Sequence, residues 1–245
     1  MAPASSGLSP VQSAGGGAAS GPPTARLALF DLDHTLLNGD TDALWCEFLM
    51  DQGLLDRAQF EPRNDAMVAA YRASAVDAQT FCSFYTATLA GRSPERWAPW
   101  LRRFMDERIA PRLPQSARGL VQWHRERGDR LVLTTATNRL LTALTARHLD
   151  IADLIATEVE VVQGLCSGRT QGVVNMREGK VARLQAWLHE QGVPEHDLTQ
   201  AVFYSDSYND LPLLSRVGQP VAVDPDERLR AHAQANGWQV LALAR

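Results

Sequence analysis

Cysteines, long apolar runs and clustered basic residues are all scarce in this sequence. Its three cysteines, Cys46, Cys82 and Cys166, lie far apart and form no C-x-x-C pair. This pattern argues against a disulfide framework or a zinc cluster and favours three thiols buried in apolar packing. No apolar stretch approaches the ~18 residues that a membrane-spanning helix needs. We therefore expect no membrane partner.

The charge balance is mildly acidic, with 24 Lys and Arg against 28 Asp and Glu and a formal net charge of −4. Without a basic run, the chain offers no surface suited to a nucleic acid. The acidic excess would repel an anionic substrate, so any phosphate site must be locally positive or hold a metal ion. The six histidines show no i, i+4 pair, which argues against a zinc hydrolase, and we expect most to be exposed or capping residues.

The N-terminal segment 1–24 is rich in Ala, Ser, Gly and Pro. It has no charged stretch followed by an apolar one, so it predicts a disordered tail rather than a signal peptide. A reduced, cytoplasmic location agrees with the sparse cysteines. The sequence does not indicate an oligomeric state.

Four short apolar runs end in polar residues, which is typical of strands buried on both faces of a parallel sheet. Segments with helical periodicity alternate with them, and several of these stop at a glycine. The chain therefore predicts an α/β fold with a doubly wound, mostly parallel sheet. The predicted strands are 27–30, 131–133, 201–204 and 220–223, and the helices are 118–127, 138–149, 178–191 and 226–236.

The first connection is different, because residues 39–114 contain no comparable strand. They show four helical patterns, at 41–53, 61–72, 77–90 and 94–109. We predict a helical cap domain over 39–114, inserted after the first strand of a core formed by 25–38 and 115–245. A further stretch, 158–174, alternates Val with polar residues between glycines and predicts a β-hairpin or flap.

Asp31 and Asp33 follow the first predicted strand and are the strongest indication of function. Buried carboxylates are costly unless a cation or hydrogen bonds compensate them. One carboxylate can attack a substrate while the other transfers protons. The alternative is a strand-end turn with solvated aspartates, but the buried run before the pair and the Thr-Leu after it favour catalysis.

Three other polar clusters follow strands or open helices at the same predicted sheet edge, where open α/β sheets bind ligands. Asp206, Asn209 and Asp210 are hard oxygen ligands suited to Mg²⁺, or alternatively a helix cap. Thr135 lies in Thr134–Asn138, which is either an anion cradle or an ordinary helix cap. Lys180 opens a helix, where a cation needs an anionic partner, although a solvated surface lysine is the simpler interpretation in isolation.

Taken in order, these segments resemble the motifs of the haloacid dehalogenase superfamily of phosphatases. Asp31–Leu36 resembles its first motif, and Thr135 and Lys180 its second and third. Asp206–Asp210 resembles the fourth motif. The resemblance runs from about Leu27 to the C-terminus. The presence of Asp33 favours a phosphatase over a dehalogenase.

The resemblance implies an Mg²⁺-dependent phosphomonoesterase that forms an aspartyl-phosphate. Asp31 would be the nucleophile and a metal ligand. Asp33 would be the acid/base and would offer its backbone carbonyl to the metal. The remaining implied roles are metal binding by Asp206 and Asp210, the latter through water, and phosphate binding by Thr135, Ala136, Lys180 and Asn209.

The helical insert resembles that of the phosphoserine phosphatase-like subgroup, and the segments Gly39–Trp45 and Thr137–Asn138 resemble its bacterial histidinol-phosphate phosphatase branch. Phosphoserine phosphatases carry Glu where Asp40 stands, and a cap arginine near Ser83, for which Arg72 or Arg92 could substitute here. The best substrate is therefore histidinol phosphate, with its cationic part bound by Asp40, Asp42, Glu47 and Trp45.

Four alternatives stay open at this stage. The substrate could be phosphoserine, and the enzyme could be a phosphotransferase with the same fold. A catalytically silent protein that binds phosphorylated ligands is a third possibility. Trp45 could equally pack in the core of the insert, and His34 borders the predicted active-site loop without a role that the sequence defines.

Overall fold

The computed structural model describes residues 25–73 and 75–243. The predicted tail at 1–24 lies outside these residues. No helix in the described ranges is long and apolar enough to cross a membrane.

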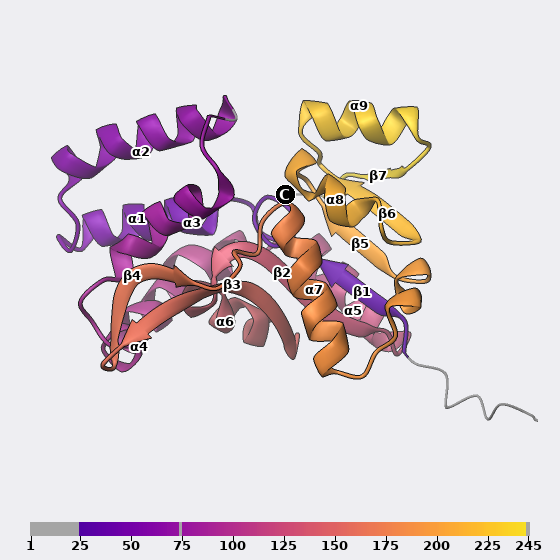
Figure 1. Ribbon diagram of the computed structural model, residues 1–245, viewed down its shortest axis with the longest axis horizontal. Coiled ribbons are helices and arrows are strands. Elements are labelled where there is room, and N and C mark those ends of the chain that lie inside the picture. The colour runs from indigo at the N-terminus through magenta and orange to yellow at the C-terminus, as the bar shows by residue number, and fades with distance from the viewer. Residues whose placement is uncertain (1–24, 74, 244–245) are drawn as a thin grey trace, which may run out of the picture.

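A seven-stranded sheet runs through the centre of the molecule, in the order β4-β3-β2-β1-β5-β6-β7 (Figure 1). Every neighbouring pair is parallel except β3 and β4. The predicted α/β class and mostly parallel, doubly wound sheet are confirmed. The strands are β1 (Leu27–Phe30), β2 (Arg130–Asn138), β3 (Asp153–Val162), β4 (Leu165–Gln171), β5 (Val202–Ser205), β6 (Gln219–Val223) and β7 (Gln239–Leu241).

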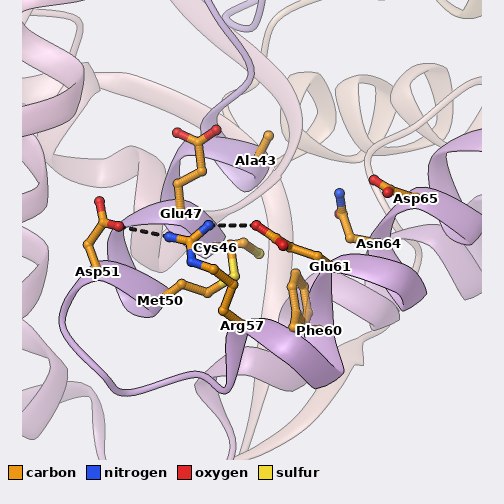
Figure 2. A pocket seen from close by; sticks show the side chains of 10 residues that line it. All are labelled: Ala43, Cys46, Glu47, Met50, Asp51, Arg57, Phe60, Glu61, Asn64 and Asp65. Atoms are coloured by element: carbon orange, nitrogen blue, oxygen red, sulfur yellow. Dashed lines mark hydrogen bonds and ion pairs between the residues drawn. The ribbon is translucent and has the colours of Figure 1, made fainter.

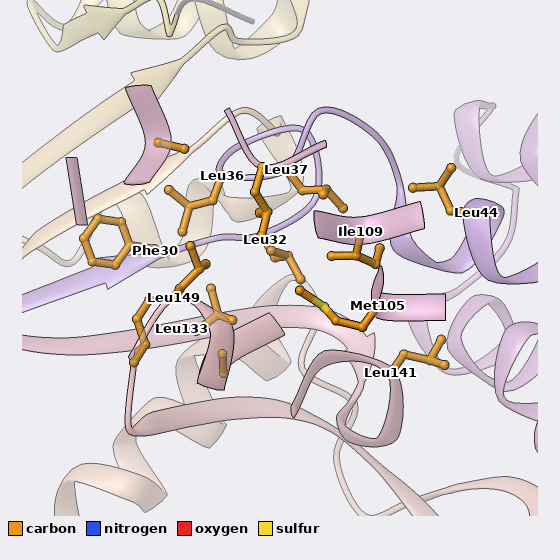
Figure 3. Close-up of a cluster of buried hydrophobic side chains, with 14 of the residues drawn as sticks. Phe30, Leu32, Leu36, Leu37, Leu44, Met105, Ile109, Leu133, Leu141 and Leu149 are labelled. Atoms are coloured by element: carbon orange, nitrogen blue, oxygen red, sulfur yellow. The ribbon is translucent and has the colours of Figure 1, made fainter. Parts of the chain in front are cut away.

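The two faces of the sheet carry separate hydrophobic clusters, because successive side chains of a strand point to opposite sides. In β1, Ala28 and Phe30 face one cluster while Leu27 and Leu29 face the other. Figure 3 shows the first cluster around Phe30 and Leu133. It is covered by α5 (Gln115–Glu126) and α6 (Arg139–His148), and the second cluster by α7 (Glu178–Glu190), α8 (Leu211–Leu214) and α9 (Glu227–Ala235).

The connection from β1 to β2 is helical, as predicted. It contains α1 (Thr41–Asp51), α2 (Arg57–Arg72), α3 (Ala78–Thr86) and α4 (Pro94–Phe104), and a π-helical turn at Met105–Ile109 follows. Side chains of α1 and α4 belong to the same cluster as β1 and β2, whereas α2 packs mainly through Phe60 and Tyr71 in two small clusters. The division into a core and a cap domain stays a prediction.

The predicted hairpin at 158–174 forms as the antiparallel pair β3 and β4. The sequence did not show that β3 also pairs in parallel with β2 and so extends the central sheet. The strand β7 and the extension of β2 to Asn138 were missed as well, because their polar residues hide the apolar pattern of a buried strand.

Burial supports the expectations for the histidines and the cysteines, with one exception among the histidines. His124 is completely buried, and its Nδ1 and Nε2 lie 2.6 Å from Asp129 Oδ2 and 2.9 Å from the Tyr204 hydroxyl. The expectation that most histidines are exposed or capping is confirmed, with His124 as the exception. The exposed histidines are His34, His148, His189 and His196. All three cysteines are buried and free, as predicted.

Candidate active site

A cavity of about 370 Å³ lies at the carboxyl edge of the sheet, between the strand ends and the helical insert. Its lining contains all the residues that the sequence predicts for catalysis, phosphate binding and metal binding, together with Asp40 and Asp42. Others, such as Tyr71, Phe81 and Met176, come from α2, α3 and the turn before α7. The predicted residues in its lining are Asp31, Asp33, Asp40, Asp42, Thr135, Ala136, Lys180, Asp206, Asn209 and Asp210.

Asp31 lies at the centre of the site, immediately after β1. Its backbone N–H donates to the carbonyl of Tyr204 at 2.9 Å, which ties it to β5. Its Oδ1 accepts from Lys180 Nζ at 2.8 Å and its Oδ2 from the Thr35 hydroxyl at 3.2 Å. Burial raises the pKa of Asp31 to about 7; the charge of Lys180 opposes this shift, while those of Asp210 and Asp33 add to it.

Lys180 is buried between Asp31 and Asp210, with 2% of its side chain exposed. Its Nζ donates to Asp210 Oδ2 at 2.6 Å, and the same oxygen accepts from the Ser205 hydroxyl at 2.7 Å. Desolvation favours the neutral amine, yet the charges of Asp210 and Asp31 and their hydrogen bonds raise the pKa of Lys180 overall. The simple interpretation of a solvated surface lysine is therefore wrong.

A tight turn before α7 presents Lys180 to the two carboxylates. The N–H of Met176 donates to the carbonyl of Val174 at 2.9 Å, and Arg177 has a φ of 53°, a conformation that costs free energy for a residue with a Cβ. A Cβ on Gly179 would lie 2.1 Å from the Val174 carbonyl oxygen, so only glycine fits there.

Asp33 is held by donors from both sides of the cavity. Its Oδ1 accepts from the backbone N–H of Thr41 at 2.8 Å and also from the Thr41 hydroxyl. Its Oδ2 accepts from the hydroxyls of Thr137 at 2.8 Å and Thr135 at 3.4 Å. These bonds orient the carboxylate between β2 and the start of α1.

Asp206 lies beside Asp31, and Thr35 bridges the two. The Thr35 hydroxyl lies 3.0 Å from Asp206 Oδ1 and accepts from the Asp206 N–H at 3.0 Å. Desolvation, and then the charges of Asp31 and Asp210, raise the pKa of Asp206 well above its usual range. Within the described ranges, no three Asp, Glu, His or Cys side chains converge as a ready metal site.

Asp40 and Asp42 form the acidic wall on the insert side. Asp40 caps α1 by accepting from the Ala43 N–H at 2.8 Å, and burial with the charge of Asp33 raises its pKa to about 6. Asp42 is buried and its Oδ2 accepts from the Thr137 hydroxyl at 3.3 Å. Burial, then the charges of Asp40 and Asp33, raise the pKa of Asp42 well above its usual range.

Three residues of the insert that the sequence offered as substrate contacts do not line this cavity. Trp45 is completely buried against Phe48, Trp97 and Phe104, and its indole N–H donates to Thr88 at 3.1 Å, so it is a core residue. Glu47 lines a different pocket. Arg92 stacks over the Trp97 ring at 4.6 Å and does not line the cavity.

That second pocket, about 500 Å³ in volume, lies between α1 and α2 (Figure 2). It is also acidic, but Arg57 pairs there with Asp51 at 2.8 Å and Glu61 at 2.6 Å, and these side chains are 40% to 50% exposed. It has no buried charge comparable to the Asp31–Lys180 pair. We therefore take the cavity at the sheet edge as the candidate active site.

The sequence patterns did not predict the hydroxyls that orient these carboxylates. Thr35, Thr41, Thr137 and Ser205 each donate to an aspartate of the site. The available signal was the position of these residues, because Thr137 lies in a threonine-rich segment after a predicted strand and the other three stand within two residues of an aspartate. Lys180 had a signal too, because it is the only lysine in the chain and the other basic residues are all arginine.

Comparisons with known proteins identify the family of the chain. A sequence model of the haloacid dehalogenase-like hydrolases matches residues 28–215. A protein of Neisseria meningitidis serogroup C (strain 8013) named histidinol-phosphatase is 39% identical over 217 residues, covering 88% of this chain and 98% of that protein. A phosphoserine phosphatase of Mycobacterium tuberculosis (strain ATCC 25618 / H37Rv) is 33% identical over 230 residues, covering 87% and 69% of the two chains.

Solved structures share the fold. A protein with unknown function from Bordetella pertussis Tohama I has a TM-score of 0.85 at 43% identity and covers 89% of this chain and 99% of its own. A substrate-bound phosphoserine phosphatase complex has a TM-score of 0.64 at 16% identity, covering 91% and 95%, which supports the fold alone. The chain belongs to the haloacid dehalogenase-like hydrolases and is an enzyme of their phosphomonoesterase type.

Proposed function

We propose that this enzyme hydrolyses the phosphate monoester of a small metabolite through an aspartyl-phosphate on Asp31. The observation that carries the proposal is the buried contact between Asp31 and Lys180 at 2.8 Å, at a cavity edged by threonine hydroxyls. A buried carboxylate nucleophile beside a fixed cation suits attack on a phosphoryl group, whose added charge the cation offsets.

The donor set fits Mg²⁺. Asp31 and Asp210 pair with Lys180, and Asp206 lies beside Asp31, so these three carboxylates when ionised carry more negative charge than one lysine can neutralise. Mg²⁺ binds through one or two carboxylates and keeps several waters. Asp31 and Asp206 would ligate it with the backbone carbonyl of Asp33, and Asp210 would hold a bound water. The bound ion would neutralise phosphate charge at the reacting centre.

The side chains then divide the reaction into two steps. In the first, an Asp31 oxygen forms a bond to phosphorus as the ester P–O bond breaks, and Asp33 gives a proton to the leaving alkoxide. In the second, Asp33 takes a proton from water, which attacks phosphorus and releases Asp31 and phosphate. Lys180, Thr135, Asn209 and the backbone of Ala136 hold the phosphoryl oxygens throughout.

Histidinol phosphate is the substrate we favour. Asp40 and Asp42 line the cavity with acidic side chains that can attract a cationic leaving group. No arginine among the described side chains lines the cavity to bind a substrate carboxylate. The relative at 39% identity is named histidinol-phosphatase, which adds support. The buried, unpaired cysteines agree with a reducing, cytoplasmic location.

A panel of phosphate monoesters tests the proposal. Histidinol phosphate, phosphoserine and an aryl phosphate would be incubated with the enzyme, with Mg²⁺ or with EDTA, and phosphate release measured. We expect Mg²⁺-dependent release without any acceptor alcohol, and the highest kcat/KM for histidinol phosphate. Faster turnover of phosphoserine would reverse the substrate assignment, and release that requires an acceptor would indicate a phosphotransferase.

A further inference from the structure

The ladder between β2 and β3 is interrupted beside the active site. Thr135 pairs with Ala156, but the next pair joins Asn138 to Thr157, so Ala136 and Thr137 have no partner in β3. A bulge of this kind redirects side chains and leaves backbone groups of the ladder unpaired. Here it brings Thr137 to 2.8 Å from Asp33 Oδ2 and places Ala136 at the cavity.

Asn175 supplies the missing hydrogen bonds at this break. Its Nδ2 donates to the carbonyl oxygens of Thr135 and Ile155, each at 2.9 Å, and lies 3.0 Å from the Thr134 hydroxyl oxygen. Its backbone N–H donates to the Thr157 hydroxyl at 3.0 Å. Two of these acceptors are carbonyls, which cannot donate, so the amide nitrogen must face them.

The same residue lies in the turn that presents Lys180. Asn175 is completely buried, between Val174, whose carbonyl Gly179 approaches, and Met176 at the cavity wall. A shift of Asn175 would therefore move the end of β2 and the start of α7 together. Its side chain joins two segments that approach the phosphoryl position from different elements.

We propose that Asn175 is a positioning residue that fixes the phosphate-binding end of β2 relative to Lys180. It contacts no reacting atom and acts through Thr135, Ala136 and Lys180. The inference rests on the proposed function, because those residues are the ones proposed to hold the phosphoryl group. Misplacement of catalytic groups by as little as ~1 Å can reduce rates by about 100-fold.

Asn175→Leu is the central test, because leucine has a similar volume and no donor. At temperatures where circular dichroism shows each variant folded, we expect its kcat/KM for p-nitrophenyl phosphate with Mg²⁺ to fall by about 100-fold, mostly in kcat. Asn175→Asp keeps one donor when protonated and should lose less. Asn236→Leu, the same change at an exposed asparagine, is the matched control and should match wild type.

Lysine NMR gives a readout that does not depend on activity. Because Lys180 is the only lysine in the chain, lysine labelled with ¹³C at Cε reports a single side chain. We expect its signal to shift or broaden in Asn175→Leu and to stay unchanged in Asn236→Leu. If Asn175→Leu fails to fold, Thr157→Val removes one acceptor of Asn175 and should give smaller changes of the same kind.

Two results would overturn the proposal. One is a folded Asn175→Leu with kcat/KM within about threefold of wild type. The other is lost activity with the Lys180 signal at its wild-type position, since the lysine would then not depend on Asn175. If the wild type releases phosphate from no ester, the proposed function fails, while the lysine signal still decides whether Asn175 positions Lys180.

Discussion

The molecule has two acidic cavities that differ in how far their charged side chains are exposed to water. Between α1 and α2, the side chains of Asp51 and Glu61 stay partly in water and pair with an exposed arginine. At the sheet edge, Asp31 and Asp210 are buried around a lysine that has almost no exposed surface. The larger cavity is thus a solvated surface, whereas the smaller one holds charge at high electrostatic cost. Burial, rather than the number of carboxylates, marks the reactive site.

Replacing Asp31, the proposed nucleophile, should lower activity more than any other change in either cavity. We expect Asp31→Asn to lower kcat by about 1,000-fold or more, because no oxygen remains to accept the phosphoryl group at that position. Phosphate release under saturating substrate measures it. Asp65→Asn, in the pocket between α1 and α2, is the matched control and should keep wild-type kcat. Survival of activity in Asp31→Asn would contradict the mechanism.

Removing the buried cation should affect both activity and stability. Lys180→Met leaves Asp31 and Asp210 buried without their partner, which we expect to cost about 3–5 kcal/mol in the free energy of unfolding at pH 7. Part of this loss should be recovered at pH 5, where the carboxylates bind protons. Urea unfolding at the two pH values measures it. A variant as stable as wild type at pH 7 would show that the pair is solvated.

In the metal-free enzyme, the buried carboxyl groups at the sheet edge should make stability depend on pH. The pKa of Asp31 is raised to about 7 and that of Asp40 to about 6, so the folded state binds more protons than the unfolded state between about pH 4 and 7. Stability from these groups is therefore lost as pH rises through this window. In EDTA we expect Tm to fall by about 5 °C from pH 5 to 8, and less in Asp31→Asn. Mg²⁺ should restore Tm at pH 8.

Asp42 should give a smaller effect that depends on the substrate. We expect Asp42→Asn to lower kcat/KM for histidinol phosphate by about tenfold and for p-nitrophenyl phosphate by much less, because only the first has a cationic group for a carboxylate to attract. Competition between the two esters in one reaction measures the ratio. Equal losses for both substrates would place Asp42 outside the leaving-group site.

The smallest effect is expected between α1 and α2. Glu61 is half-exposed and pairs with Arg57 across one helical turn, a contact that contributes little in water. Glu61→Gln should leave kcat/KM within about twofold and Tm within about 2 °C of wild type. Differential scanning calorimetry and the aryl phosphate assay check both. A larger change in kcat/KM would show that this pocket communicates with the sheet edge.

The sequence patterns predicted the mostly parallel sheet and most of the residues that line the candidate site. The apolar runs ending at Asp31 and Asp206 marked buried strands, and parallel strands bring their carboxyl ends to one edge. Burial of Lys180 and His124 could not be predicted, because Asp31 and Tyr204, which contact them in the folded chain, lie far away in sequence. Trp45 was ambiguous for the same reason, since its aromatic neighbours on α4 decide whether it packs or binds.

The contact between Gly179 and the Val174 carbonyl limits which sequences can encode this enzyme. At position 179, every residue with a side chain meets a backbone atom, which cannot rotate away as a flexible side chain would. At the adjacent Glu178, which is exposed, most residues should be accepted. In a saturation library selected for phosphate release, glycine should be nearly fixed at 179 beside a freely varying 178. The range of residues accepted at each position would then show where the backbone passes close to another segment, without a structure.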